Sequence, residues 1–174
     1  MATSSHPAMA KFDPTSQVIA HSSLKGAQAA SMVAPPIYLV SSLILRRGSG
    51  FSVRHLMRYS TLGTAAGAGL GAAVGWVRLR TEPLVAIEDR VFRLANNASQ
   101  IRADDYSIIG ATLGSLFLPT LFLKRAPFAS LVLGGGAIGL GAGVWVHVAK
   151  MISEGKKTKP EGMVGEIPVI GGNK

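Results

Sequence analysis

The residues whose spacing suggests chemistry are the glycines of the run Gly134–Gly139. Gly134, Gly136 and Gly139 match G-x-G-x-x-G, the loop that holds the pyrophosphate of a dinucleotide. Glu154 follows about where the ribose-binding acid of such a site would stand. A dinucleotide site also needs a strand, a helix and a second strand before that acid. One uncharged apolar run occupies this stretch instead, so we expect no cofactor-binding site.

Side chains that could act as metal ligands, general acids or nucleophiles are few and scattered. There is no cysteine, which excludes thiolate metal sites and cysteine nucleophiles. The four histidines form no i,i+4 pair and no cluster with acids: His6, His21, His55 and His147. No set of serine, histidine and carboxylate suited to acyl transfer is visible. We therefore predict no catalytic residue, no metal site and no small-molecule substrate, and we do not expect an enzyme.

Asp104 and Asp105 stand directly before an apolar segment. Negative charge is favoured at a helix N-terminus, so we interpret the two acids as an N-cap and interfacial anchor rather than as an ion site. No acid is predicted inside an apolar segment, where one would mark a proton or ion path.

Glycines recur at steps of four residues within the apolar segments. On a helix this spacing places them on one face. In water each would cost about 1 kcal/mol relative to alanine. In lipid a spanning segment must be helical, and glycine then offers a flat surface to a second helix. We predict helix-packing seams at Gly63, Gly67, Gly71, Gly75, Gly110, Gly114, Gly135, Gly139 and Gly143.

Composition favours a membrane protein over a soluble domain. Of the 174 residues, 48% are hydrophobic and 16% are charged, against roughly 25% charged in soluble domains. The formal net charge is +9, and the basic residues gather at the ends of apolar stretches, where they serve as interfacial anchors. No basic surface interleaved with aromatic residues is present, so we expect no nucleic-acid partner.

These patterns predict an all-α membrane protein whose helices pack through glycine seams. The helix bundle covers residues 27–149, with spans at about 27–45, 59–77, 106–123 and 128–149. Four spans are expected, and three are the alternative, because Pro35 and Pro36 interrupt the first. The short connection before the last span predicts an antiparallel hairpin of the last two.

The remaining segments are expected to lie outside the membrane. Leu84, Ile87, Val91 and Leu94 recur near helical spacing, which predicts an amphipathic helix over about 83–102. Its charges cancel, so its apolar face is expected on a protein partner rather than on a charged bilayer. Residues 1–26 are predicted to form a flexible polar tail, and 150–174 a second polar tail.

Two short loops, 46–58 and 124–127, contain six basic residues and no acid. The positive-inside rule then places both loops inside and both termini outside. The loops are either plain topology signals or a head-group site for an anionic phospholipid such as cardiolipin. The candidate head-group contacts are Arg46, Arg47, Arg54, Arg58, Lys124 and Arg125.

Two families share motifs with this sequence. The four-span inner-membrane protein translocases are similar in their glycine seams and in the motif Arg102-Ala103-Asp104-Asp105 before Gly110-x-x-x-Gly114. Over most of its length the chain resembles the fungal NUXM-type accessory subunits of mitochondrial respiratory complex I. The residues of that resemblance are Ala34-Pro35-Pro36, Leu45-Arg46-Arg47, Glu88-Asp89-Arg90, Arg93-Leu94 and Gln100-Ile101-Arg102-Ala103-Asp104-Asp105.

The second resemblance implies a supernumerary subunit of the mitochondrial inner membrane. Such a subunit has no redox centre, and it stabilises or helps to assemble the membrane arm of NADH:ubiquinone oxidoreductase. Its partners would be other membrane subunits and lipids, with both termini in the intermembrane space. A translocase component is the alternative, and a small channel or lipid-organising protein is a third, since glycine seams also line some pores.

Overall fold

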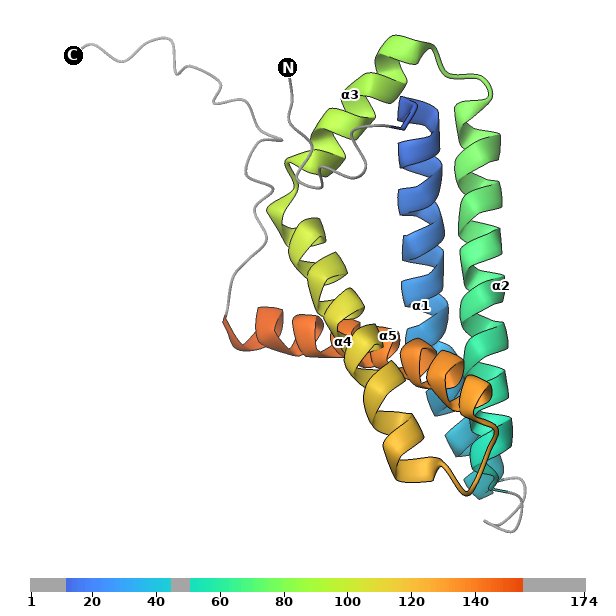
Figure 1. The fold of residues 1–174 in the computed structure, drawn as a ribbon. Coiled ribbons are helices and arrows are strands. Elements are labelled where there is room, and N and C mark those ends of the chain that lie inside the picture. The colour runs from blue at the N-terminus through green and yellow to red at the C-terminus, as the bar shows by residue number, and fades with distance from the viewer. Residues whose placement is uncertain (1–11, 45–50, 155–174) are drawn as a thin grey trace, which may run out of the picture.

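The computed structural model describes residues 12–44 and 51–154, which fold into five α-helices without a strand. The helices are α1 (Pro14–Ile44), α2 (Val53–Leu79), α3 (Leu84–Ala95), α4 (Ala98–Phe122) and α5 (Phe128–Ser153), as Figure 1 shows. The predicted all-α class is confirmed.

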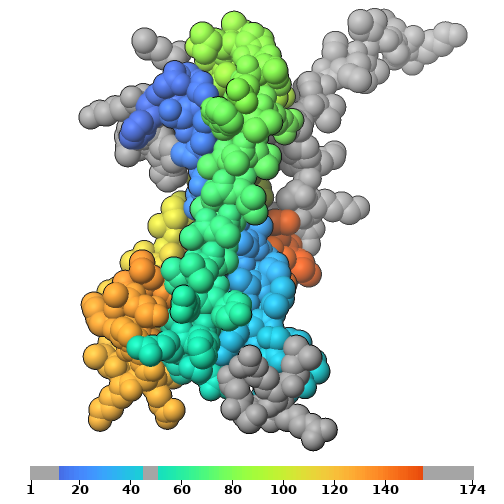
Figure 2. Space-filling model, turned by 90° about the vertical axis from the view of Figure 1, so that its right-hand side faces the viewer, coloured from blue at the N-terminus to red at the C-terminus, as the bar shows by residue number. Residues whose placement is uncertain are grey.

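Two helical hairpins make up the molecule. α1 and α2 run side by side in opposite directions, and α4 and α5 form the second antiparallel pair, as the sequence predicted. α3 connects the hairpins at one end, and α5 runs across the α1–α2 pair rather than along it (Figure 1). The start of α5 lies beside the start of α2 (Figure 2).

The first helix is longer than predicted. It begins at Pro14, so the flexible tail over 1–26 is wrong for residues 14–26, while 1–11 lie outside the described residues. Proline suits the first turn of a helix, and the Asp13 carboxylate accepts a hydrogen bond from the Thr15 amide at 3.1 Å. Pro35 and Pro36 lie inside the helix, which neither starts nor ends there.

The predicted amphipathic helix over 83–102 is in fact two helices. α3 ends at Ala95, and α4 begins at Ala98 because the Asn97 side chain accepts a hydrogen bond from the Gln100 amide at 3.2 Å. The third apolar helix therefore starts well before residue 106. Asp104 lies in its second turn, so the interpretation of this acid as an N-cap is wrong.

The apolar face of α3 packs within the chain. Ile87 is buried with Val18 of α1 and Leu79 of α2. This part of the predicted apolar face therefore packs on the first hairpin, whereas Leu84 at the start of α3 is 65% exposed. On the exposed side of α3, a hydrogen bond from Arg93 to the Asp89 carboxylate raises the pKa of the arginine.

The packing is inside-out relative to a soluble domain. The largest fully buried side chains among the described residues are Met57, Leu131, Ser31, Ser60 and Ser107. Most large apolar side chains point outward instead, among them Leu70 and Leu121, which are 68% and 69% exposed. Apart from Met57, Leu131 and a few other apolar residues, small residues thus line the helix contacts, and leucines and aromatic residues cover the surface.

Two of the described helices, α1 and α5, are long and apolar enough to cross a membrane. α2 contains many glycines, which add little to its hydropathy. The predicted spans also differ at their ends, since α2 and α5 extend past 59–77 and 128–149. The prediction of a tail from residue 150 is therefore wrong for residues 150–153, which are helical, and residues 155–174 lie outside the described part of the chain.

Candidate functional site: glycine seams and charged ends

The α1–α2 seam brings two backbones into contact. A Cβ added to Gly67 would overlap the carbonyl oxygen of Gly26, and one added to Gly26 would overlap the carbonyl oxygen of Gly67. Gly71 meets the backbone of Ser22 in the same way. At the edges, a Cβ on Gly63 would lie 2.7 Å from Ala34 Cβ, and one on Gly75 would lie 2.9 Å from Ser22 Cβ.

The partner strip on α1 consists of Ser22, Gly26, Ala30 and Ala34, again at steps of four residues. Sequence reasoning missed it because only one member is glycine. The strip could have been found by searching for small residues of any kind at four-residue steps, since alanine and serine also permit close helix approach.

The α4–α5 seam repeats this geometry. A Cβ on Gly110 would overlap the carbonyl oxygen of Gly139, and one on Gly114 would overlap that of Gly135. Gly143 lies against the backbone of Tyr106, where an added Cβ would come within 2.7 Å of the carbonyl carbon. Each glycine predicted for a seam thus lies against a neighbouring helix.

Further glycines of α5 face the first hairpin. A Cβ on Gly134 would lie 2.5 Å from Met57 Cβ, and one on Gly141 would lie 2.6 Å from the carbonyl carbon of Ser31. α5 therefore makes most of the packing contacts between the two hairpins. The dinucleotide-like run Gly134–Gly139 is part of this packing.

A buried polar cluster links α1 to α4. Asp104 Oδ1 accepts hydrogen bonds from Lys25 Nζ at 2.6 Å and Gln28 Nε2 at 2.7 Å. Gln28 Nε2 also donates to Ser107 Oγ at 2.8 Å, and His21 Nδ1 lies 3.8 Å from Asp104 Oδ2. Gln28 and Ser107 are 4% and 0% exposed. A buried carboxylate needs such partners, because an unpaired buried charge is strongly unfavourable.

More charged and polar groups join α4 to α5 near the same end of the bundle. Arg102 Nη1 lies 3.3 Å from Glu154 Oε2, and Lys150 Nζ donates to the Tyr106 hydroxyl at 2.8 Å. His147 is buried beside Tyr106, with the ring centroids 6.0 Å apart. Together with the Lys25–Asp104 pair, these contacts show that charged residues of α1, α4 and the end of α5 lie close together at one end of the bundle.

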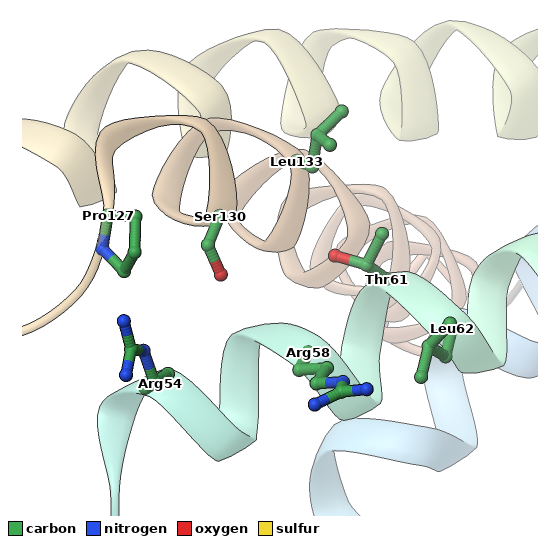
Figure 3. Close-up of a pocket in the computed structure, with 7 residues that line it drawn as sticks. All are labelled: Arg54, Arg58, Thr61, Leu62, Pro127, Ser130 and Leu133. Carbon is green, nitrogen blue, oxygen red and sulfur yellow. The ribbon is translucent and has the colours of Figure 1, made fainter.

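The opposite end is basic. Arg54 and Arg58 of α2 line a groove of about 370 Å³, with Pro127, which precedes α5, and Ser130 of α5 on the facing side (Figure 3). Lys124 and Arg125, also predicted as head-group contacts, are exposed in the turn before α5 and do not line this groove. Arg46 and Arg47 lie outside the described residues.

A family model described as "Protein of unknown function (DUF1757)" matches residues 6–150. The matched range includes α1 to α4 and nearly all of α5, and with them both seams and the polar cluster. The search of curated proteins gave no match.

Proposed function

We propose that this chain, which belongs to the DUF1757 family of proteins of unknown function, is a non-catalytic subunit that packs helices within a membrane. The observation that carries the proposal is the distribution of side-chain size. Glycine, alanine and serine face one another between the helices, whereas leucine, valine and phenylalanine face outward. Between membrane helices, close backbone approach drives association, and lipid covers the outward apolar surface.

Four spans account for the sequence better than two. Uncharged runs cover residues 26–45, 59–77, 106–123 and 126–149, one on each long helix. At 1.5 Å per residue they extend about 27 to 36 Å, which matches a hydrocarbon core of roughly 30 Å. The charged contacts of α1, α4 and α5 gather at one end of these runs, and the arginine groove lies at the other.

Much surface remains for lipid and for other subunits. Only 28% of the apolar part of α1 and 39% of that of α5 is buried within the chain. The resemblance to NUXM-type subunits favours the mitochondrial inner membrane and the membrane arm of respiratory complex I. In this arrangement the basic loops face the matrix, and the termini face the intermembrane space.

The test is migration in mild detergent. Mitochondrial membranes of a cell that makes the tagged chain are solubilised and separated on a native gel, and the tag is followed by immunoblot. Co-migration with assembled complex I supports the proposal. Migration alone contradicts the subunit role. Migration with an import complex, together with crosslinks to a precursor arrested in transit, would replace it with the translocase alternative.

A further inference from the structure

The groove between α2 and the start of α5 has the composition of a phosphate site. We propose that it binds the phosphate group of an anionic phospholipid. The inference rests on the proposed membrane location but not on any particular partner complex. Of the four candidate basic residues that the structure describes, it selects Arg54 and Arg58.

The cationic wall is formed by two guanidinium groups one helical turn apart. Arg54 and Arg58 are both exposed, and neither takes part in an ion pair among the described residues. At the opposite end of the bundle, by contrast, Lys25 and Arg102 are paired with acids. Two neighbouring cations without an acid repel each other, and an anion bound between them removes this repulsion. Arginine also suits phosphate because its fork of N–H donors binds two oxygens at once.

The facing wall contributes donors from the first turn of α5. Pro127 precedes this helix, and no side chain caps its N-terminus. The first amides of a helix have no carbonyl partner within the helix and attract anions. The Ser130 side chain, which also lines the groove, adds a hydroxyl donor on the same side. Figure 3 shows the Ser130 hydroxyl pointing into the groove from α5, on the side that faces Arg54 and Arg58 of α2, so side-chain donors from two helices face one space.

The other end of the groove is apolar, which favours a phospholipid over free phosphate. Leu62 and Leu133 line it and are 58% and 61% exposed. In Figure 3 Leu62 lies beyond Arg58 along α2, and Leu133 lies further along α5 than Ser130. A lipid with its phosphate at the arginines would place its acyl chains against the leucines, on the apolar surface of the bundle.

The experiment titrates lipid onto the full-length chain in neutral detergent and measures binding by native mass spectrometry. Phosphatidylglycerol is compared with phosphatidylcholine of the same chain length, and inorganic phosphate is added as a competitor. The test variant is Arg54→Gln/Arg58→Gln. The matched control is Lys124→Gln/Arg125→Gln, which removes the same charge at the same end but outside the groove.

The expected result is preferential binding of phosphatidylglycerol, weakened about 25-fold in the test variant. This value follows from an approximately fivefold contribution of each arginine to binding an anionic lipid. The control variant should lose much less, and phosphate should not compete. Equal losses in both double variants would mean only general charge attraction and would overturn the proposal. Full competition by inorganic phosphate would assign the groove to the free anion instead.

Circular dichroism of each variant in detergent verifies that it is folded. Lipid binding and migration on the native gel together separate this inference from the proposed function. A variant that loses lipid yet still co-migrates with its complex leaves the packing role intact. A wild-type chain that binds phosphatidylglycerol but migrates alone would refute the subunit role only.

Discussion

Gly67 and Gly69 provide a matched pair for testing the seam, because they lie two residues apart on α2. A Cβ on Gly67 would overlap the Gly26 carbonyl oxygen and Ala30 Cβ. A Cβ on Gly69 would meet no other described residue within 4 Å. Replacing either glycine by alanine raises helix propensity by the same amount, up to about 1 kcal/mol. Any difference between the variants therefore reports contact between α1 and α2.

The magnitude follows from what must move. Backbone atoms surround Gly67, so α1 and α2 must separate along the seam, and such overpacking costs about 1–3 kcal/mol. Because the propensity gain is common to both variants, we predict that the free energy of unfolding is about 2 kcal/mol lower for Gly67→Ala than for Gly69→Ala. Gly69→Ala should leave it unchanged or raise it by up to about 1 kcal/mol. Adding Gly26→Ala to Gly67→Ala should cost less than the sum of the single changes, because the first clash already separates the helices.

The assay is equilibrium unfolding of the purified full-length chain in mixed micelles, where the denaturing detergent fraction is raised and helicity is followed by circular dichroism. Equal effects of Gly67→Ala and Gly69→Ala would refute the reasoning, since the seam would then make no energetic contribution.

Three further changes test other contacts with the same unfolding assay. Asp104→Ala should destabilise the chain by about 1–3 kcal/mol, because it removes the acceptor of the buried Gln28 amide and of the partly exposed Lys25 ammonium. Lys25→Met/Asp104→Leu should recover most of that loss, and a double variant as unstable as Asp104→Ala would contradict this. Asn97→Ala should lower the free energy of unfolding by about 1 kcal/mol, because α4 loses its N-cap. An unchanged free energy of unfolding would show that this cap does not stabilise the chain. Gly134→Ala should destabilise the packing of α5 against α2, because the added Cβ would lie 2.5 Å from Met57 Cβ. Met57→Gly removes that Cβ and should relieve part of the clash, so a purely additive double variant would contradict direct contact.

The seam glycines could be predicted because their signal is local. Four-residue spacing fixes which face of a helix they occupy, whatever the partner. The sequence signal does not say which helices pair, because pairing depends on residues far apart in the chain. The partner strip around Gly26 consists mostly of alanine and serine. The polar cluster is less predictable still, since Lys25 and Asp104 are separated by 79 residues.

The helix boundaries divide in the same way. The break between α3 and α4 could have been predicted, because Asn97 is a preferred N-cap residue and is followed three positions later by Gln100. The N-terminal half of α1 could not, because its polar sequence forms a helix through burial of Val18 against Leu79 and Ile87. Such tertiary contacts override a weak local preference.

The proposed packing role requires lipid to cover the outward faces of α2 and α4. Because the sequence contains no cysteine, a single cysteine introduced on each face reports whether water reaches it. Leu70→Cys in α2, Leu116→Cys in α4 and Ser153→Cys at the end of α5 are each exposed positions. Membrane sheets open on both faces are treated with a charged maleimide, and labelling is compared before and after denaturation. The account predicts labelling of Ser153→Cys in intact sheets, and labelling of the other two only after denaturation. Rapid labelling of Leu70→Cys and Leu116→Cys in intact sheets would show that these faces meet water, and the four-span packing role would be wrong.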